Sequence, residues 1–217
     1  MKLSEIHRPK TLDAVVGQDK VITTIKGVIE REGLLGQAFF FVGNSGTGKT
    51  STARILADMV QPYYGRNEID AMDLSLDKIR EWEELSEKRV IGCQGWSFIV
   101  NEAARIRGPV LRRLLTTLEK PSMVQNSFWV FTTTPKGKES LFDGEEEEIP
   151  FGSRVQFFDF NGGESTTLAF ALAAQKIAKA HNLDVRPLTE YLALTRKHNH
   201  NLREILGVIG RGDFKVR

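Results

Sequence analysis

Short apolar runs alternate with stretches of helical periodicity over the first three quarters of the chain. Each run is bounded by glycine, proline or polar residues, which is typical of buried strands. We predict strands over residues 37–42, 68–73, 96–100, 127–131 and 154–160. Apolar positions at helical spacing predict helices over residues 50–60, 76–89 and 108–120. This alternation predicts an α/β fold with an open, mainly parallel five-stranded sheet flanked by helices.

The pattern changes after the glycine pair that follows Asn161. Only helical periodicity is found downstream, over residues 166–181, 187–198 and 201–210. We therefore expect two domains, a sheet-containing domain of residues 1–161 and a small three-helix domain of residues 162–217.

Composition narrows the class of protein. Of the 217 residues, 41% are hydrophobic and 27% charged, as in ordinary globular domains, and the formal net charge of +2 favours no class of partner. The single cysteine, Cys93, excludes an intrachain disulfide and a cysteine-cluster zinc site. Because no apolar run approaches the ~18 residues of a membrane helix and no signal-peptide core is present, we expect a cytoplasmic protein without membrane contact. The acidic run of residues 143–148 is interpreted as a solvated loop.

The sequence GNSGTGKT, Gly43–Thr50, lies between a predicted buried strand and a predicted helix. It matches the phosphate-binding pattern G-x4-G-K-[ST], in which backbone N–H groups and the helix N-terminus face the phosphates. Lys49 is expected to reach the β- and γ-phosphates, and the Thr50 hydroxyl to bind Mg²⁺. The predicted nucleotide-binding residues here are Gly43, Asn44, Ser45, Gly46, Thr47, Gly48, Lys49, Thr50 and Ser51.

A second polar pair ends the strand SFIVNE, where nucleotide hydrolases of this type carry an acidic residue near the Mg²⁺. Asn101 holds the first position and can offer a carbonyl oxygen to a metal-bound water, but no charge. Glu102 holds the second and is a candidate to handle the attacking water. The alternative is that this pair merely ends a strand.

With these motifs in place, the chain resembles AAA+ ATPases of the clamp-loader family, which includes the bacterial DNA polymerase III gamma/tau subunits and the small subunits of replication factor C. The resemblance covers about residues 8–210 and is carried by motifs in family order: RPKTLDAVVGQDKVI, LRRLLTTLEKP, FTTTP, GSRVQFF and NLREIL. It implies an adenine-cradling segment that includes Val16. It also implies Thr133 as a sensor residue, Arg154 as an arginine finger acting in trans, and Arg203 as a second sensor. For each of the last three, an ordinary structural role is the alternative.

The departures from the family pattern concern charge and length. Asn101 replaces the usual aspartate, and Val155 stands where the family has cysteine. The gamma subunit's four-cysteine zinc module is missing, and a longer acidic loop of about residues 139–150 precedes Arg154. The family's helical collar domain has no counterpart before Arg217, so we expect either a fragment or a different assembly.

A cluster of arginines surrounds the predicted helix that begins at Gly108-Pro109. Its members are Arg105, Arg107, Arg112 and Arg113. Cations near a helix N-terminus oppose the helix dipole, so an anion is expected nearby. Intrachain pairing with acidic residues is one source of that anion. The resemblance favours the other, the phosphates of primer-template DNA.

Together these features predict an ATPase with ATP and Mg²⁺ as cofactors, acting as a clamp-loader subunit. The implied partners are other AAA+ subunits, a sliding clamp and primer-template DNA. Two alternatives stay open. One is an ATP-binding scaffold or arginine-finger donor with little hydrolysis. The other is a different AAA+ machine, such as a helicase loader or branch-migration factor.

Overall fold

The computed structural model describes residues 2–62, 66–89, 91–106, 108–142, 148–160, 163–183 and 186–214. Within them, five parallel strands form one sheet in the order β2-β3-β4-β1-β5. The strands are β1 (Ala38–Val42), β2 (Asn67–Asp70), β3 (Trp96–Asn101), β4 (Ser127–Thr133) and β5 (Gln156–Asp159). The predicted α/β fold is therefore confirmed, with all strand pairs parallel.

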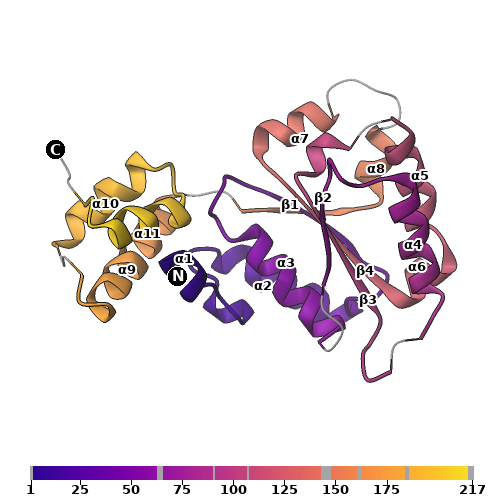
Figure 1. Ribbon diagram of the computed structural model, residues 1–217, viewed down its shortest axis with the longest axis horizontal. Coiled ribbons are helices and arrows are strands. Elements are labelled where there is room, and N and C mark those ends of the chain that lie inside the picture. The colour runs from indigo at the N-terminus through magenta and orange to yellow at the C-terminus, as the bar shows by residue number, and fades with distance from the viewer. Residues whose placement is uncertain are drawn as a thin grey trace.

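Helices cover both faces of the sheet (Figure 1). The longer helices are α2 (Asp19–Glu32), α3 (Lys49–Val60), α4 (Leu76–Ser86), α5 (Gly108–Leu118), α9 (Glu164–Ala180), α10 (Leu188–Lys197) and α11 (Leu202–Arg211). The shorter ones are α1 (Leu3–Ile6), α6 (Pro121–Asn126), α7 (Pro135–Phe142) and α8 (Glu148–Ser153), with 3-10 turns η1 (Leu12–Ala14) and η2 (Ala103–Arg105). None of the described helices combines the length and the apolar character needed to cross a membrane.

The two faces of β1 bury alternate side chains in separate cores. Phe40 faces the core beneath α4, α5, α6 and α8, where Trp82 and Trp129 pack edge to face. Phe39 and Phe41 face the core beneath α2 and α3. Because both faces of β1 are covered, the whole strand is apolar, which explains why the sequence predicted it well.

The C-terminal helices form a third core of their own. Tyr191, Leu194, Ile205 and their neighbours join α9, α10 and α11. The N-terminal helix α1 packs against α11, and Leu3 belongs to the rim of this core (Figure 1). The N-terminal segment therefore connects the C-terminal helices to the sheet. The expected domain junction at residues 161–162 lies outside the described residues.

Several elements differ from the sequence-based expectations. The strand expected from residue 154 begins at Gln156, because α8 extends to Ser153. The acidic stretch expected to be a loop is helical at both ends, in α7 and in α8, while residues 143–147 lie outside the described part. Helix α2 was not predicted from periodicity, although Ile22, Ile25 and Val28 form its buried face.

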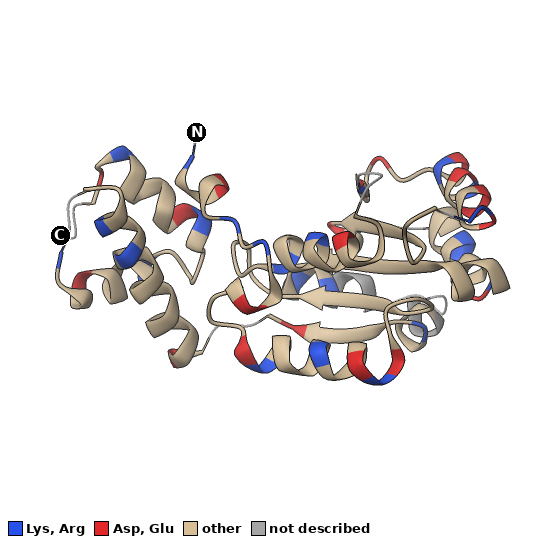
Figure 2. Cartoon of the chain, turned by 90° about the horizontal axis from the view of Figure 1, so that it is seen from below, with Lys and Arg blue, Asp and Glu red and all other residues tan. Residues whose placement is uncertain are grey.

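Acidic and basic residues are interspersed along the helices, and the strands carry few of either (Figure 2). Within the described part of the chain, Glu83 on α4 is a charged residue in the interior, with only 5% exposure. Its carboxylate is bonded by Arg113, by Thr117 and by Lys120, whose Nζ lies 2.6 Å away. Burial alone would raise the pKa of Glu83, but these hydrogen bonds outweigh it and lower that pKa below its ordinary value.

Glu83→Gln removes the charge that two half-exposed cations share, so we expect the free energy of unfolding to fall by about 1–3 kcal/mol. Because the folded-state pKa of Glu83 is lowered, its stabilisation is complete at neutral pH and is lost as pH falls through that pKa. The difference between variant and wild type should therefore shrink in acid. Thermal melting at pH 7 and pH 3.5 checks this. The exposed Glu84→Gln on the same helix is the control, and an equal loss from both variants would contradict the assignment.

Candidate nucleotide-binding site

A cavity of about 340 Å³ opens at the carboxyl edge of the sheet. Four parts of the chain line it. The phosphate-loop segment contributes Ser45, Gly46, Thr47, Gly48, Lys49, Thr50 and Ser51, and the strand ends contribute Glu68, Asp70, Asn101, Glu102, Thr132 and Thr134. The N-terminal segment adds residues that include Arg8 and Val16, and helices α9 and α11 add others that include Phe170 and Arg203. Open parallel sheets bind ligands at this edge.

The loop after β1 has the backbone conformation that its glycines permit. Gly46 and Gly48 have φ of 76° and 106°, which a residue with a side chain rarely adopts. The Thr47 hydroxyl donates to the Asn44 carbonyl at 2.8 Å and closes the turn. Helix α3 begins at Lys49, so its free N–H groups and positive dipole end face the cavity. The arrangement suits a polyphosphate.

The side chain of Lys49 folds back onto the phosphate loop. Its Nζ donates to the carbonyl oxygens of Gly43 and Asn44 at 2.7 and 2.8 Å, so these two residues bind the lysine although they do not line the cavity. Burial lowers the pKa of Lys49 to about 8; Glu102 opposes the shift and Arg203 adds to it. An incoming phosphate would replace the carbonyls as acceptor and favour the charged form.

The polar end of β3 is held by a network of hydrogen bonds. The Asn101 Oδ1 accepts from Thr132 Oγ1 at 2.9 Å and from Thr50 Oγ1 at 3.3 Å. Its Nδ2 donates to Glu68 Oε1 at 2.8 Å. Asn101 therefore joins the phosphate loop, β4 and β2, and its carbonyl oxygen lies beside the Thr50 hydroxyl.

Glu102 adopts an unusual backbone conformation directly after the strand. Its φ of 54° and ψ of 41° lie in the left-handed region, which costs about 1 kcal/mol or more for a residue with a side chain. The side chain is exposed and lines the cavity. Such strain is often stored at functional sites, where it directs a side chain toward a ligand.

Thr133, the expected sensor residue, is the last residue of β4. Thr133 does not line the cavity; its hydroxyl is buried, without a hydrogen-bond partner among the described residues. Thr132 and Thr134, on either side, face the cavity instead. Because side chains alternate along a strand, the neighbours of Thr133 face the cavity while Thr133 itself faces the interior. The sensor role of Thr133 stays a prediction.

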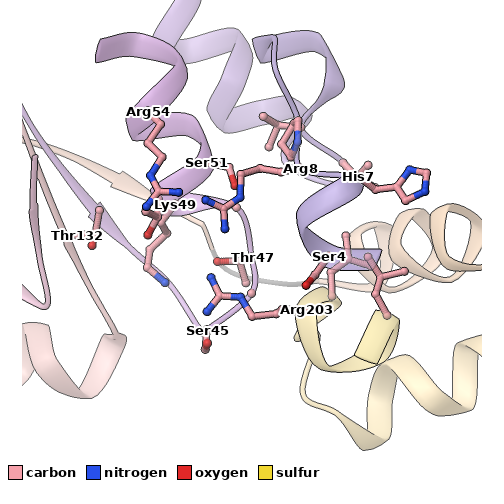
Figure 3. A pocket seen from close by; sticks show the side chains of 18 of the residues that line it. Ser4, His7, Arg8, Ser45, Thr47, Lys49, Ser51, Arg54, Thr132 and Arg203 are labelled. Atoms are coloured by element: carbon pink, nitrogen blue, oxygen red, sulfur yellow. The ribbon is translucent and has the colours of Figure 1, made fainter. Parts of the chain in front are cut away.

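The C-terminal helices contact the phosphate loop directly. Arg203 of α11, for which the resemblance implied a sensor role, lines the cavity (Figure 3). Asn201 caps α11, and its Oδ1 accepts from the Glu204 N–H at 3.2 Å. That oxygen also lies only 2.0 Å from where a Cβ on Gly46 would be, so a side chain at position 46 would displace α11. The phosphate loop and the N-terminus of α11 are therefore in close contact.

Several residues at the cavity were not predicted as site residues. Arg8 and Arg54 point into the same hollow as Lys49 and Arg203 (Figure 3). Arg8 lies inside the N-terminal motif, from which only Val16 was selected. Arg54 and Glu68 carry no motif signal of their own, and only the folded chain brings them together.

The remaining predicted residues lie away from the cavity. Arg154 follows α8 and its Nη2 pairs with Glu119 Oε1 at 2.6 Å. Arg105 and Arg112 are exposed, and Arg105 contacts Met72. Arg113 pairs with the buried Glu83. Arg107 lies outside the described residues.

The donor set at the strand ends fits Mg²⁺. The Thr50 hydroxyl and the Asn101 carbonyl are hard oxygen donors that lie 3.3 Å apart. Mg²⁺ usually takes few protein ligands and completes its shell with phosphate oxygens and water. Glu68, Asp70 and Glu102 add negative charge around the same cavity.

The lowered pKa of Lys49 predicts a pH dependence. In the free protein the ammonium loses its proton as pH rises through about 8, while a bound polyphosphate keeps it charged. Nucleotide affinity should therefore fall about tenfold between pH 7 and pH 9. Titration of a fluorescent ATP analogue measures this. In the Lys49→Arg variant the guanidinium stays charged. The nucleotide affinity of this variant should therefore not change between pH 7 and pH 9. A flat wild-type profile would contradict the role of Lys49.

Sequence comparison finds relatives among replication proteins, and no protein-family model matches. The replication factor C small subunit of Archaeoglobus fulgidus is 36% identical over 124 residues, which are 53% of this chain and 37% of that protein. The DNA polymerase III subunit tau of Bacillus subtilis is 26% identical over 208 residues, 84% of this chain and 34% of that protein. The chain spans about a third of the length of these curated relatives.

Solved structures show the same fold at low identity. A RuvB mutant of Thermotoga maritima matches with a TM-score of 0.71 at 17% identity, over 95% of this chain and 65% of that one. The replication initiator DnaA bound to AMPPCP and single-stranded DNA matches with a TM-score of 0.65 at 17% identity, over the same shares. The sequence relatives therefore support a likeness to clamp-loader-type AAA+ proteins, and the solved structures show that the fold is shared.

Proposed function

We propose that the chain binds ATP with Mg²⁺ in the cavity at the carboxyl edge of the sheet and hydrolyses it. The observation that carries the proposal is Lys49, held on the loop carbonyls in a cavity that also contains Thr50, Glu102 and Arg203. A polyphosphate would meet loop N–H groups, the lysine and the arginine together. Few other ligands would use so many cationic and N–H donors at once.

Each residue has a separate role in this proposal. Lys49 and Arg203 neutralise the phosphates. The segment that includes Val16 contacts the adenine base. Thr50 and Asn101 hold Mg²⁺, which supplies charge stabilisation to the transferring phosphoryl group when bound. Glu102, directed by its left-handed backbone, accepts the proton of the attacking water. Thr132, rather than Thr133, joins these groups from β4.

The wider activity rests on the relatives. We propose that residues 1–161 form the nucleotide-binding domain, that residues 162–217 form its helical lid, and that the chain acts in the loading of a sliding clamp onto primer-template DNA. Other AAA+ subunits are its proposed neighbours. Arg154 is proposed to leave Glu119 and reach the nucleotide of such a neighbour, which agrees with its distance from the cavity of its own chain. Asn101 favours a second candidate, an ATP-binding scaffold with little hydrolysis, because the amide brings no charge to Mg²⁺.

Glu102→Gln decides between these candidates. Removing a general base lowers the rate about 10²–10⁴-fold, and ATP affinity should stay within about threefold because the phosphate donors are untouched. The measurement is steady-state hydrolysis at increasing protein concentration, with Glu87→Gln as an exposed control. A wild-type rate that Glu102→Gln leaves unchanged would exclude Glu102. No wild-type hydrolysis at any concentration, with ATP bound, would favour the scaffold.

We propose that DNA binds the exposed Arg105 of η2 and Arg112 of α5. Phosphate contacts release counterions, so the slope of log affinity against log salt should shrink by ~1 for each contact removed. We expect Arg105→Ala with Arg112→Ala to flatten the slope for primed DNA by about 2 and to leave ATP affinity unchanged. Arg113 is spared because its loss would also expose Glu83. Arg80→Ala on α4 is the control. An unchanged slope in the double variant would remove these residues from the DNA surface.

A further inference from the structure

A chain of hydrogen bonds links α3 to the end of β3 through β2. Arg54 of α3 binds Glu68 with two donors, Nε to Oε2 at 2.7 Å and Nη2 to Oε1 at 2.9 Å. Glu68 Oε1 in turn accepts from Asn101 Nδ2 at 2.8 Å. The two side chains of the ion pair are largely covered, with 30% and 18% exposure for Arg54 and Glu68. The carboxylate is therefore fixed in place on both sides.

The donor and acceptor pattern determines how the Asn101 amide points. An ionised carboxylate can only accept hydrogen bonds, so the amide NH₂ must face Glu68. The carbonyl oxygen then faces the hydroxyls of Thr50 and Thr132, which donate to it. An amide with no such neighbour has two orientations of similar energy, and one of them would present N–H groups to a cation. Glu68 excludes that orientation.

The sheet register explains why an aspartate at position 101 does not fit this chain. Asp70 of β2 pairs with Asn101, and Glu68 lies two residues earlier on the same face of that strand. A carboxylate at position 101 would lie at hydrogen-bond distance from the Glu68 carboxylate, and like charges at that distance repel. The asparagine is therefore matched to the glutamate, and the pair carries a single negative charge.

We propose that Glu68, held by Arg54, is a positioning residue that directs the Asn101 carbonyl oxygen toward nucleotide-bound Mg²⁺. The inference rests on the proposed ATP site and adds to it the residue that makes an asparagine usable there. Ligands of metals commonly depend on such outer partners for their orientation. Glu68 itself is assigned no contact with the metal or the nucleotide.

Inverting the pair tests this assignment. In the double variant Glu68→Gln with Asn101→Asp, the glutamine NH₂ donates to the aspartate while its carbonyl accepts from Arg54 Nε. The bond from Arg54 Nη2 to Oε1 is lost, but the bond between positions 68 and 101 survives with its polarity reversed. The two single variants break it in opposite ways. Glu68→Gln removes the carboxylate that keeps the Asn101 NH₂ group facing position 68. Asn101→Asp places a second carboxylate beside that of Glu68. Glu81→Gln, on the exposed face of α4, removes a charge elsewhere and is the control.

Two readouts are needed, melting temperature and the Mg²⁺ concentration that gives half of the maximal gain in ATP-analogue affinity. We expect Asn101→Asp to lower the melting temperature by at least about 4 °C. Glu68→Gln should raise the Mg²⁺ requirement at least about threefold. The melting temperature of the double variant should return to within about 2 °C of the wild-type value. Its Mg²⁺ requirement should be no higher than that of the wild type, because the negative charge now lies on residue 101, the proposed metal ligand.

Two results would overturn the inference. One is a double variant whose losses equal the sum of the two single losses in both readouts. The other is a Mg²⁺ requirement that Glu68→Gln leaves at the wild-type value. Failure of the proposed function is distinct, because the wild type would then bind no ATP analogue at any Mg²⁺ concentration.

Discussion

The parallel pairing of β1 between β4 and β5 is the constraint on which the site depends. It brings the carboxyl ends of all strands to one edge, so the loop after β1 lies beside the ends of β4 and β3. The register is held by side chains such as Phe39 and Phe40, which are completely buried on opposite faces. A slip of one residue would exchange these faces and move Lys49 away from Asn101. The hydrophobic core therefore sets the geometry of the polar groups.

The sequence predicted most of the sheet and the phosphate loop, for a physical reason. Strands covered on both faces are continuous apolar runs, and the loop carries glycines in a pattern that few other functions require. Because these runs are apolar throughout, the sequence does not indicate which residues of a strand lie on the same face of the sheet. Nothing in FTTTP distinguishes Thr132 from Thr133 until β4 is placed beside β3. Helix α2 was not predicted, although Ile22, Ile25 and Val28 have helical spacing. Glu68 was not predicted because its partners Arg54 and Asn101 are distant in sequence.

Asparagine at position 101 is therefore best understood as part of a pair. Considered alone, Asn101 lacks the negative charge of the aspartate that the family has there, and it should bind a metal more weakly. Beside Glu68, its NH₂ group gains an acceptor and its carbonyl gains a fixed direction. The packing of Asn201 against Gly46 has a related consequence. It places α11, and with it Arg203, directly beside the phosphate loop.

A crystal structure of the chain with a non-hydrolysable ATP analogue and Mg²⁺ tests the central claim most directly. The account predicts phosphates on the loop N–H groups, with Lys49 Nζ moved from the Gly43 and Asn44 carbonyls to a phosphate oxygen. It also predicts that the Asn101 carbonyl faces the metal while its NH₂ stays on Glu68. An analogue bound elsewhere, or a loop without ligand at saturating concentration, would contradict it.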